Sequence, residues 1–309
     1  MTQFDFIIIG GGAAGMTAAC RIRKGSPQAK VLLIDRGETL GGVLCQCVHH
    51  GFGLSYFGED LTGTEYARRL EQQVKNASVQ VLLCTEVLEV SPDKTLTFSN
   101  VQGIQTCSFR HLILASGCTE RALGSLGVSG TRPAGIFTAG EAQKLINVHH
   151  QDIGDRAVII GSGDIGMILA RRLSLCGKKV ICMTEIADKS PALSRNRINC
   201  LEAFHIPLLL RTRLTEVHGY PHIEAVTLLD IPTNTLRRVE CSLLIVAAGL
   251  LPDRTLIQNF FPPLWEAAPD LNALPKWLHL CGNCHHVHPI VDGVSFQAEK
   301  LADRLTETI

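Results

Sequence analysis

The sequence lacks a surplus of charge, a long hydrophobic run and a basic leader. Its 309 residues carry 29 Lys plus Arg and 29 Asp plus Glu, so nothing favours binding to nucleic acid or to an anionic membrane surface. The longest later apolar run, residues 243–251, is far too short to cross a bilayer. The apolar stretch near the N-terminus has no basic segment before it, which argues against a secretory signal. We therefore expect a cytoplasmic protein without a membrane span, whose 12 cysteines are reduced thiols.

The first stretch with a clear chemical meaning is an apolar strand that runs into a glycine-rich turn at residues 4–15. Gly10, Gly12 and Gly15 form a Gly-x-Gly-x-x-Gly pattern, and the residues that follow predict a helix. In such a turn the first glycine permits a tight bend, the second lets a pyrophosphate approach, and the third lets the helix pack on the strand. Asp35 ends the next predicted strand 20 residues after Gly15, where an acid accepts hydrogen bonds from a ribose hydroxyl. The sequence therefore predicts a dinucleotide site, with the phosphates on the free amides at the start of the helix.

The same pattern returns after a connector with many glycines and prolines. Gly161, Gly163 and Gly166 follow a second apolar strand, and Glu185 ends the strand after that. One chain thus carries two predicted dinucleotide sites. A carboxylate at Glu185 suits a free 2′-hydroxyl and would repel a 2′-phosphate, so NAD(H) is favoured over NADP(H). Residues 186–188 contain no arginine, although Arg195 and Arg197 lie further along.

Other segments fit between these two patterns. Short strands are expected at residues 79–83, 86–90, 95–99 and 106–109, and a buried strand at 111–117 ends in small residues. Thr62 and Glu65 have the spacing of a capping box, which predicts a helix over residues 62–75. Residues 226–229 and 237–240 predict an antiparallel pair. Residues 243–253 repeat the pattern of 112–117, so both are interpreted as crossings between domains. A last helix is predicted over residues 292–305, with Asp292 as its N-cap.

Together these motifs resemble the FAD- and NAD(P)-dependent pyridine nucleotide–disulfide oxidoreductase superfamily. A narrower similarity rests on residues 46–54, 131–140, 161–166 and 281–283, with 286–288 and 291–292. It is to flavoprotein subunits associated with glycerol-3-phosphate dehydrogenases, and to the larger subunits of dye-linked L-proline dehydrogenase, opine oxidase and hydrogen cyanide synthase.

The resemblance implies an α/β fold of two nested Rossmann-like domains, with FAD in the first and NAD(H) in the second. The implied boundaries are 1–120 and 247–309 for the FAD domain and 121–246 for the inserted NAD(H) domain. Electrons would leave to a partner subunit of a dehydrogenase complex or to another acceptor. The candidate cofactor-binding residues are Gly10, Gly12, Ala13, Ala14, Gly15, Asp35, Arg36, Gly41, Gly42, Ser116, Gly117, Gly282, Asn283 and Asp292, together with Gly161, Gly163, Asp164, Ile165, Gly166, Glu185 and Gly249.

Thiols and imidazoles gather in two places, residues 43–58 and 281–288. Cys47 with His49 is the expected functional unit of the first, because a nearby imidazole can lower the thiol pKa. Well-packed, merely buried side chains are the alternative there. A second alternative pairs Cys45 with Cys47 as the redox centre of a stand-alone thiol–disulfide reductase, although a one-residue spacing would strain the disulfide.

In the second cluster, His286 and His288 are expected to line the substrate side of the flavin. The Cys-x-x-Cys-His spacing of residues 281–285 matches haem attachment. Two residues of that stretch already belong to the flavin motif, so neither haem nor a metal is expected. A hypothesis from another class is a non-catalytic flavin-binding scaffold, which NADH would fail to reduce.

Overall fold

The computed structural model describes residues 2–258 and 274–307. The chain divides into two compact units, each described by itself below. Unit 1 comprises Met1–Thr119 and Leu251–Ile309, and unit 2 comprises Glu120–Leu250. The segments that join them, β9 (Cys118–Glu120) and β19 (Leu250–Pro252), are hydrogen-bonded to each other as two short strands. Both units combine sheets with helices, so the predicted α/β class is confirmed.

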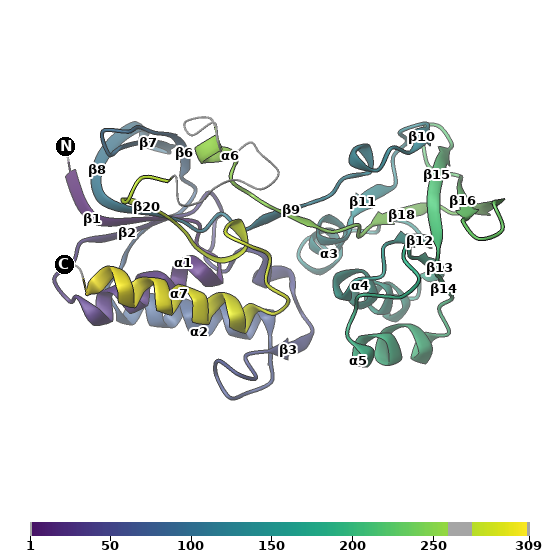
Figure 1. Cartoon of the computed structure of the whole chain (residues 1–309), viewed down its shortest axis with the longest axis horizontal. Coiled ribbons are helices and arrows are strands. Elements are labelled where there is room, and N and C mark those ends of the chain that lie inside the picture. Colours follow the sequence, from purple (N-terminus) through teal and green to yellow (C-terminus); the bar gives the residue numbers. More distant parts are fainter. Residues whose placement is uncertain (1, 259–273, 308–309) are drawn as a thin grey trace. The chain divides into compact units, whose positions relative to one another are not determined.

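Unit 1 is built on a seven-stranded sheet in the order β5-β2-β1-β8-β7-β6, with β20 also paired to β8 (Figure 1). The strands are β1 (Thr2–Ile9), β2 (Val31–Ile34), β5 (Gln80–Leu82), β6 (Glu86–Val90), β7 (Thr95–Asn100), β8 (Gly103–Leu114) and β20 (Leu278–Leu280). The pairs β1–β2, β1–β8, β2–β5 and β8–β20 are parallel, whereas β6–β7 and β7–β8 are antiparallel. β8 is one continuous strand where the sequence predicted two, because its first half pairs with β7 and its second half with β1 and β20.

The helices α1 (Ala13–Gly25), α2 (Gly63–Asn76) and α7 (Val291–Thr306) pack together in unit 1 (Figure 1). α2 begins as predicted, because Thr62 accepts a hydrogen bond from the amide of Glu65 and the Glu65 carboxylate accepts one from the amide of Thr62. Smaller elements complete the unit: the 3-10 helices η1 (Gly42–Gln46) and η7 (Gly282–Cys284), the hairpin strands β3 (His50–Phe52) and β4 (Leu61–Thr62), and α6 (Thr255–Gln258).

Unit 2 has a parallel five-stranded sheet in the order β11-β18-β12-β13-β14 and a four-stranded sheet in the order β10-β15-β16-β17. The first contains β11 (Ile136–Thr138), β18 (Leu243–Val246), β12 (Arg156–Ile160), β13 (Lys179–Thr184) and β14 (Leu208–Leu209). The second contains β10 (Ser129–Gly130), β15 (Thr212–His218), β16 (Ala225–Asp230) and β17 (Thr235–Glu240). Its helical elements are η2 (Leu123–Leu126), α3 (Ala139–Asn147), α4 (Asp164–Leu175), α5 (Ser194–Asn196), η3 (Arg197–Leu201) and η4 (Glu202–Phe204). β16 and β17 are antiparallel, as predicted.

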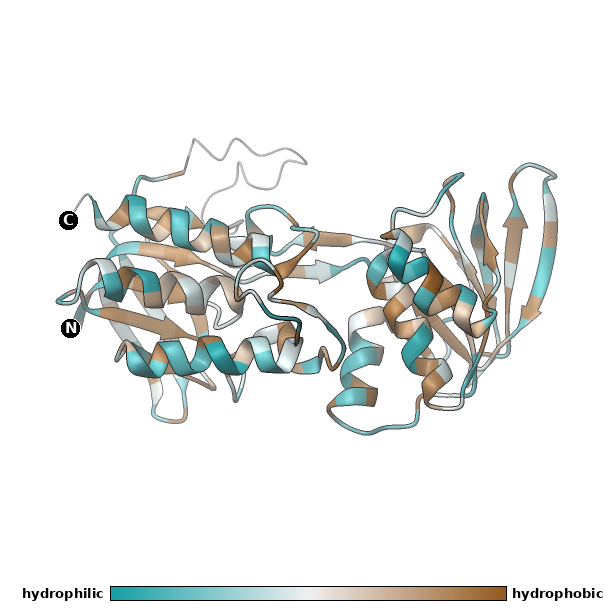
Figure 2. Ribbon diagram, turned by 90° about the horizontal axis from the view of Figure 1, so that it is seen from below, coloured by the Kyte–Doolittle hydropathy of each residue, from teal (hydrophilic) through white to brown (hydrophobic). Residues whose placement is uncertain are grey.

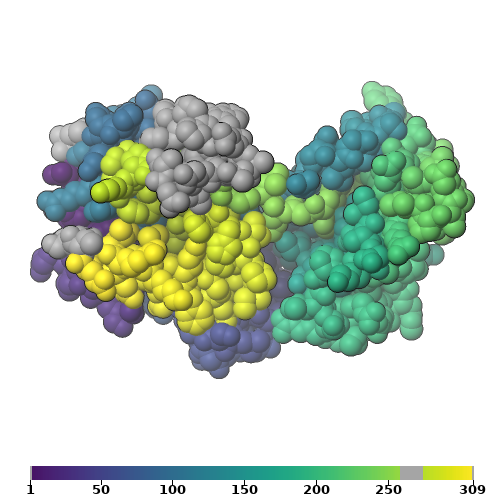
Figure 3. Space-filling model, in the orientation of Figure 1, coloured from purple at the N-terminus to yellow at the C-terminus, as the bar shows by residue number. Residues whose placement is uncertain are grey.

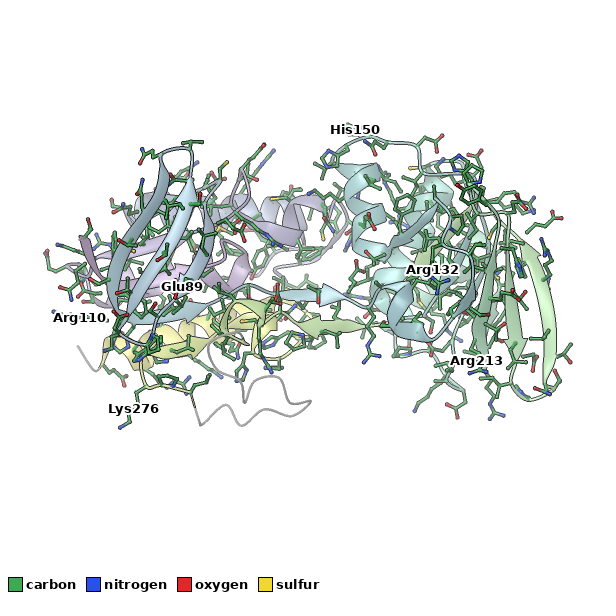
Figure 4. The ribbon with its side chains drawn as sticks, turned by 90° about the horizontal axis from the view of Figure 1, so that it is seen from above. Glu89, Arg110, Arg132, His150, Arg213 and Lys276 are labelled. Atoms are coloured by element: carbon green, nitrogen blue, oxygen red, sulfur yellow. The ribbon has the colours of Figure 1, made fainter. Side chains whose placement is uncertain are left out.

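Hydrophobic strands form the interior of both units, whereas the helices alternate hydrophobic and hydrophilic residues (Figure 2). In unit 1, Ile8 and Leu33 face the helices and Ile7 and Leu32 face the opposite side, and all four are fully buried or nearly so. This alternation within β1 and β2 is what a sheet covered on both faces requires. Charged residues such as Glu89, Arg110 and Arg213 point away from the cores (Figure 4).

Candidate functional site

In the turn between β1 and α1, protein atoms leave no room for a side chain at two of the three glycines, whereas the space beside the third is empty. A Cβ on Gly10, which has φ +107°, would collide with the carbonyl oxygen of Ala115, and one on Gly15 would collide with the carbonyl oxygen of Gly10. Gly12, the N-cap of α1, has φ −76°, and a Cβ there would meet nothing within 4 Å. Neither the backbone angles nor a described neighbour requires glycine at position 12. A ligand that approaches the backbone closely would require it.

The turn between β12 and α4 repeats this arrangement. A Cβ on Gly161, at φ +95°, would collide with the carbonyl oxygen of Ala247, and one on Gly166 would lie 3.0 Å from the carbonyl oxygen of Gly161. Gly163, the N-cap of α4, has φ −71° and again nothing within 4 Å of a Cβ. Each unit therefore presents the start of a helix with an unobstructed face and no side-chain cap.

The two predicted acids also make matching contacts. Asp35 accepts hydrogen bonds from the amides of Gly11, at 2.5 Å, and Gly37, at 2.6 Å. Glu185 accepts them from the amide and hydroxyl of Ser162, at 3.1 and 2.7 Å, and from the amide of Ala187, at 3.1 Å. Each carboxylate thus ties the glycine-rich turn to the loop after the next strand. Because a carboxylate has about four acceptor sites, capacity remains for a ribose hydroxyl.

Gly41 and Gly42 lie against the open turn of unit 1. The amide of Gly41 donates to the carbonyl of Gly11 at 2.8 Å, and a Cβ on Gly42 would lie 3.3 Å from the Cα of Gly12. Both glycines have positive φ, +118° and +55°. Arg36 is exposed just beyond Asp35. The paired glycines therefore border the same opening as Gly12.

Residues from the end of β8 and from η7 reach the same side of unit 1. A Cβ on Gly282 would lie 2.7 Å from the Cβ of Ala14, which places η7 on the start of α1. The Asn283 side chain accepts a hydrogen bond from the amide of His288 and donates one to the Sγ of Cys118 at 3.6 Å. Ser116 and Gly117, which follow β8, both contact Asp253. The Ser116 hydroxyl donates to the carbonyl of Asp253 at 2.6 Å, and the carbonyl of Gly117 accepts from the amide of Asp253.

In unit 2, Asp164 fastens a loop to the start of α4. Its Oδ1 accepts from the amide of Leu193 at 2.9 Å and from the side-chain amide of Asn196 at 2.7 Å. The neighbouring Ile165 is 40% exposed. Gly249 has φ +110°, and its carbonyl accepts from the amide of Arg121. Arg197, one of the two arginines after Glu185 noted in the sequence, lies 3.5 Å from Glu202 in an exposed ion pair.

The predicted N-cap role of Asp292 is wrong. The N-cap of α7 is Ile290, and Asp292 is the second helical residue. Its buried carboxylate accepts three backbone hydrogen bonds, from Gly53 at 2.9 Å, Ser55 at 2.8 Å and Tyr56 at 3.1 Å. These contacts anchor the segment that follows the predicted Cys47–His49 unit. The sequence spacing could not reveal them, because the partners are more than 230 residues apart.

The expected lowering of the Cys47 pKa by His49 is also wrong. Cys47 is buried, and burial raises the pKa of its thiol to about 12, with a smaller effect of Cys45 in the same direction. Burial raises the pKa of Cys45 as well. The two thiols donate to different backbone carbonyls, Cys45 to Leu40 and Cys47 to Val43, both at 3.3 Å. Neither environment favours a thiolate at neutral pH.

His286 and His288 lie together after η7, with ring centroids 4.0 Å apart. Two residues that the sequence did not single out complete this cluster. Gln297 of α7 contacts both His288 and His285, and Arg254 donates to the carbonyls of Cys284 and His285. The helical period places Gln297 on α7 but gives no register against the histidines. In the described part of the chain, no group of three or more His, Cys, Asp or Glu residues has the geometry to hold a metal ion.

Within residues 2–258 and 274–307, no helix has the length and apolar character that crossing a bilayer requires.

Comparisons with known proteins point to one family. The family model described as pyridine nucleotide-disulphide oxidoreductase matches residues 4–261. The chain is 29% identical over 263 residues to a thioredoxin reductase of Mycolicibacterium smegmatis, covering 84% of this chain and 79% of that protein. It is 25% identical over 280 residues to the hydrogen cyanide synthase subunit HcnB of Pseudomonas aeruginosa, covering 82% of this chain and 58% of that protein. The fold is similar to that of T. acidophilum thioredoxin reductase, with a TM-score of 0.79 at 18% identity over 100% of this chain and 99% of that chain.

Proposed function

Since the chain belongs to the pyridine nucleotide-disulphide oxidoreductase family, whose members are enzymes that use FAD and NAD(P)H, we propose that it transfers electrons from NADH through FAD to a second acceptor. In this proposal unit 1 binds FAD and unit 2, as an inserted domain, binds NAD(H). The observation that carries it is the repeated site. Each unit has an open N-cap glycine and a carboxylate bonded to the adjacent turn.

The residues present suit the two cofactors. Unshielded amides at the starts of α1 and α4 would bind the pyrophosphates, helped by the positive ends of the helix dipoles. Asp35 and Glu185 would accept hydrogen bonds from ribose hydroxyls. When bound, FAD would accept a hydride equivalent from NADH and pass the electron pair on. A negative Glu185 supports NADH over NADPH, and the pairing of Arg197 with Glu202 leaves one arginine fewer for a 2′-phosphate.

Two classes of acceptor remain in this proposal. The similarity to HcnB favours a partner subunit of a dehydrogenase complex, whereas the similarity to a thioredoxin reductase favours a disulfide. If a disulfide is reduced, the raised pKa values of Cys45 and Cys47 argue against that pair as the relay. Counting reactive thiols in the oxidised and the NADH-reduced protein separates the routes. A gain of two thiols that is lost in Cys45→Ser would establish the pair, and no gain would exclude it.

The first experiment is an anaerobic absorbance titration of the purified protein with NADH, then with NADPH. We expect the oxidised flavin band to bleach at much lower NADH than NADPH concentration. A yellow protein that neither nucleotide bleaches would support the scaffold hypothesis. A protein that takes up no FAD would overturn the proposal.

Two matched variants assign the cofactors to the units. Gly12→Ala and Gly163→Ala add a methyl group that meets no protein atom within 4 Å, at backbone angles that alanine adopts. We expect both to unfold at nearly the wild-type urea concentration. Gly12→Ala should lose FAD on gel filtration, and Gly163→Ala should keep FAD but require more NADH for bleaching. Unchanged cofactor binding in both would show that the phosphates bind elsewhere.

A further inference from the structure

Two imidazoles, those of His285 and His288, contact the side chain of Gln297 in unit 1. A third, that of His286, contacts both of these rings. The histidines lie in the segment that precedes α7 and the glutamine lies in α7, both coloured yellow in Figure 3. The Oε1 of Gln297 lies 2.8 Å from the amide nitrogen of Gly282 and 3.1 Å from the Nε2 of His288. Its Nε2 lies 3.0 Å from the Nδ1 of His285, which lies 3.0 Å from the Nδ1 of His286. One connected chain of hydrogen bonds therefore joins a backbone amide to His286.

The backbone amide fixes the direction of every bond in this chain. The Gly282 N–H can only donate, so the glutamine atom that faces it is the oxygen and the other is the NH2 group. The glutamine NH2 donates to the Nδ1 of His285, which must be unprotonated. Two unprotonated nitrogens 3.0 Å apart would repel each other, so the Nδ1 of His286 carries a proton and shares the single lone pair of His285 Nδ1 with the glutamine NH2. The Nε2 of a neutral His286 is then left with a lone pair. By the same logic, His288 carries its proton on Nε2, which donates to Gln297.

The assignment requires neutral neighbours, and their surroundings keep them neutral. Burial lowers the pKa of His285, and the nearby His286 and Arg254 lower it further. Burial also lowers the pKa of His288, against the weaker opposite effect of its bond to Gln297. His286 itself is exposed. The ring of His286 is thus open to solvent, while its hydrogen bond with His285 sets the tautomer.

The cluster is rigidly attached to the proposed FAD unit. The Arg254 guanidinium donates to the carbonyls of Cys284, at 2.8 Å, and His285, at 2.7 Å. Gly282, which starts the chain of hydrogen bonds, packs on Ala14 at the start of α1. The same α1 start is where the open Gly12 lies.

We propose that the Nε2 of His286 transfers the proton that accompanies electron transfer to the second acceptor. Gln297 is the positioning residue, because through His285 it directs the Nδ1 of His286 into the hydrogen-bond chain and leaves the Nε2 for proton transfer. The proposal rests on the proposed function. Reduction of a two-electron organic acceptor, a disulfide or a quinone, takes one hydride equivalent from NADH through the cofactor and one proton. The Nε2–H bond of protonated His286 breaks as an atom of the acceptor forms a bond to the same hydrogen. The neutral ring then regains a proton from water, so NADH, acceptor and one proton yield NAD+ and the reduced acceptor.

The tautomers can be read directly by NMR of 15N-histidine-labelled protein. We expect wild-type His286 to carry its proton on Nδ1 and His288 on Nε2. In Gln297→Glu the new carboxylate can accept but not donate, so His285 should gain a proton on Nδ1 and His286 should lose its Nδ1 tautomer. Gln72→Glu, the same change on the exposed face of α2, is the control and should leave all three rings unchanged. A wild-type His286 protonated on Nε2, or unaltered by Gln297→Glu, would overturn the proposal.

The role in turnover is tested with dichlorophenolindophenol as a two-electron acceptor at saturating NADH. Removal of a proton-transfer group typically costs at least about 10²-fold, so we expect His286→Gln to lower kcat by about that factor. A His286→Gln variant with wild-type kcat would refute the role.

These outcomes are separable from those of the proposed function. Flavin that NADH cannot bleach would remove the hydride route yet leave the NMR assignment intact. Normal bleaching by NADH would leave the proposed function standing. If His286 were then found protonated on Nε2, or if His286→Gln left the rate of dye reduction unchanged, the proton-transfer role of His286 would be refuted.

Discussion

The strongest test of the architecture is the replacement Asp292→Asn. In the wild type, Oδ1 of Asp292 accepts from the amide of Gly53, and Oδ2 accepts from the amides of Ser55 and Tyr56. An asparagine has one oxygen, so its NH2 group must face at least one of these buried amides as a second donor. Hydrogen bonds to a charged group are worth roughly 1.5–3 kcal/mol each, and neutral ones about half. Losing one bond and weakening the others should lower the unfolding free energy of unit 1 by about 3 kcal/mol.

Urea unfolding followed by circular dichroism measures this loss, and hydrogen exchange locates it. We expect the amides of Gly53, Ser55 and Tyr56 to exchange faster in Asp292→Asn. The control is Asp60→Asn, because Asp60 also accepts one backbone hydrogen bond in this segment, from Gly51 at 2.8 Å, but is exposed. It should cost at most about 0.5 kcal/mol, as surface changes usually do. If Asp292→Asn is as mild as Asp60→Asn, the anchoring role of Asp292 is refuted.

Three further predictions concern charge and burial. Glu185→Gln removes the repulsion between the carboxylate and a 2′-phosphate, which is worth about 1 kcal/mol. The ratio of NADH to NADPH efficiency in flavin bleaching should therefore fall by about fivefold, and an unchanged ratio would contradict the role of Glu185 in selecting NADH. Burial raises the pKa of Cys47 to about 12, so iodoacetamide at pH 8 should label the exposed Cys84 and Cys176 and spare Cys47, as peptide mass spectrometry would show. Burial, aided by neighbouring cations, lowers the pKa of His279 from 6.5 to about 4. The unfolded chain therefore binds the proton first, so stability should fall between pH 6.5 and 4 by up to about 3 kcal/mol, and His279→Gln should flatten that part of the urea-midpoint profile.

The elements that could be predicted are those whose determinants lie close together in the sequence. The turns at Gly10 and Gly161 need only a strand, three glycines and a helix, and the structure has all three in both places. The start of α2 depends on Thr62 and Glu65, three residues apart. In each case the stabilising contact is local, so composition and spacing contain the information.

The errors concern contacts between distant segments. Sequence places His49 beside Cys47 but does not show how deeply Cys47 is buried, and burial outweighs any effect of the imidazole on its pKa. An acid just inside a helix suggested a cap, yet Asp292 turns to a loop more than 230 residues earlier. Gln297 was missed for the same reason, because only the folded register of α7 brings it to Gly282 and the histidines.

The two glycine-rich turns differ in features that affect how long a bound cofactor would stay at each. In unit 1 the start of α1 has no acid in its first turn, and it is bordered by Gly42 and Gly282 from two other segments. In unit 2 the first residue of α4 is Asp164, whose carboxylate opposes an anion at a helix start by about 0.3–1 kcal/mol. The next residue, Ile165, is 40% exposed. A bordered site without opposing charge favours a cofactor that stays bound, whereas an exposed site with an acid favours one that exchanges. That division is what an enzyme needs if it keeps FAD and releases NAD+ at each turnover.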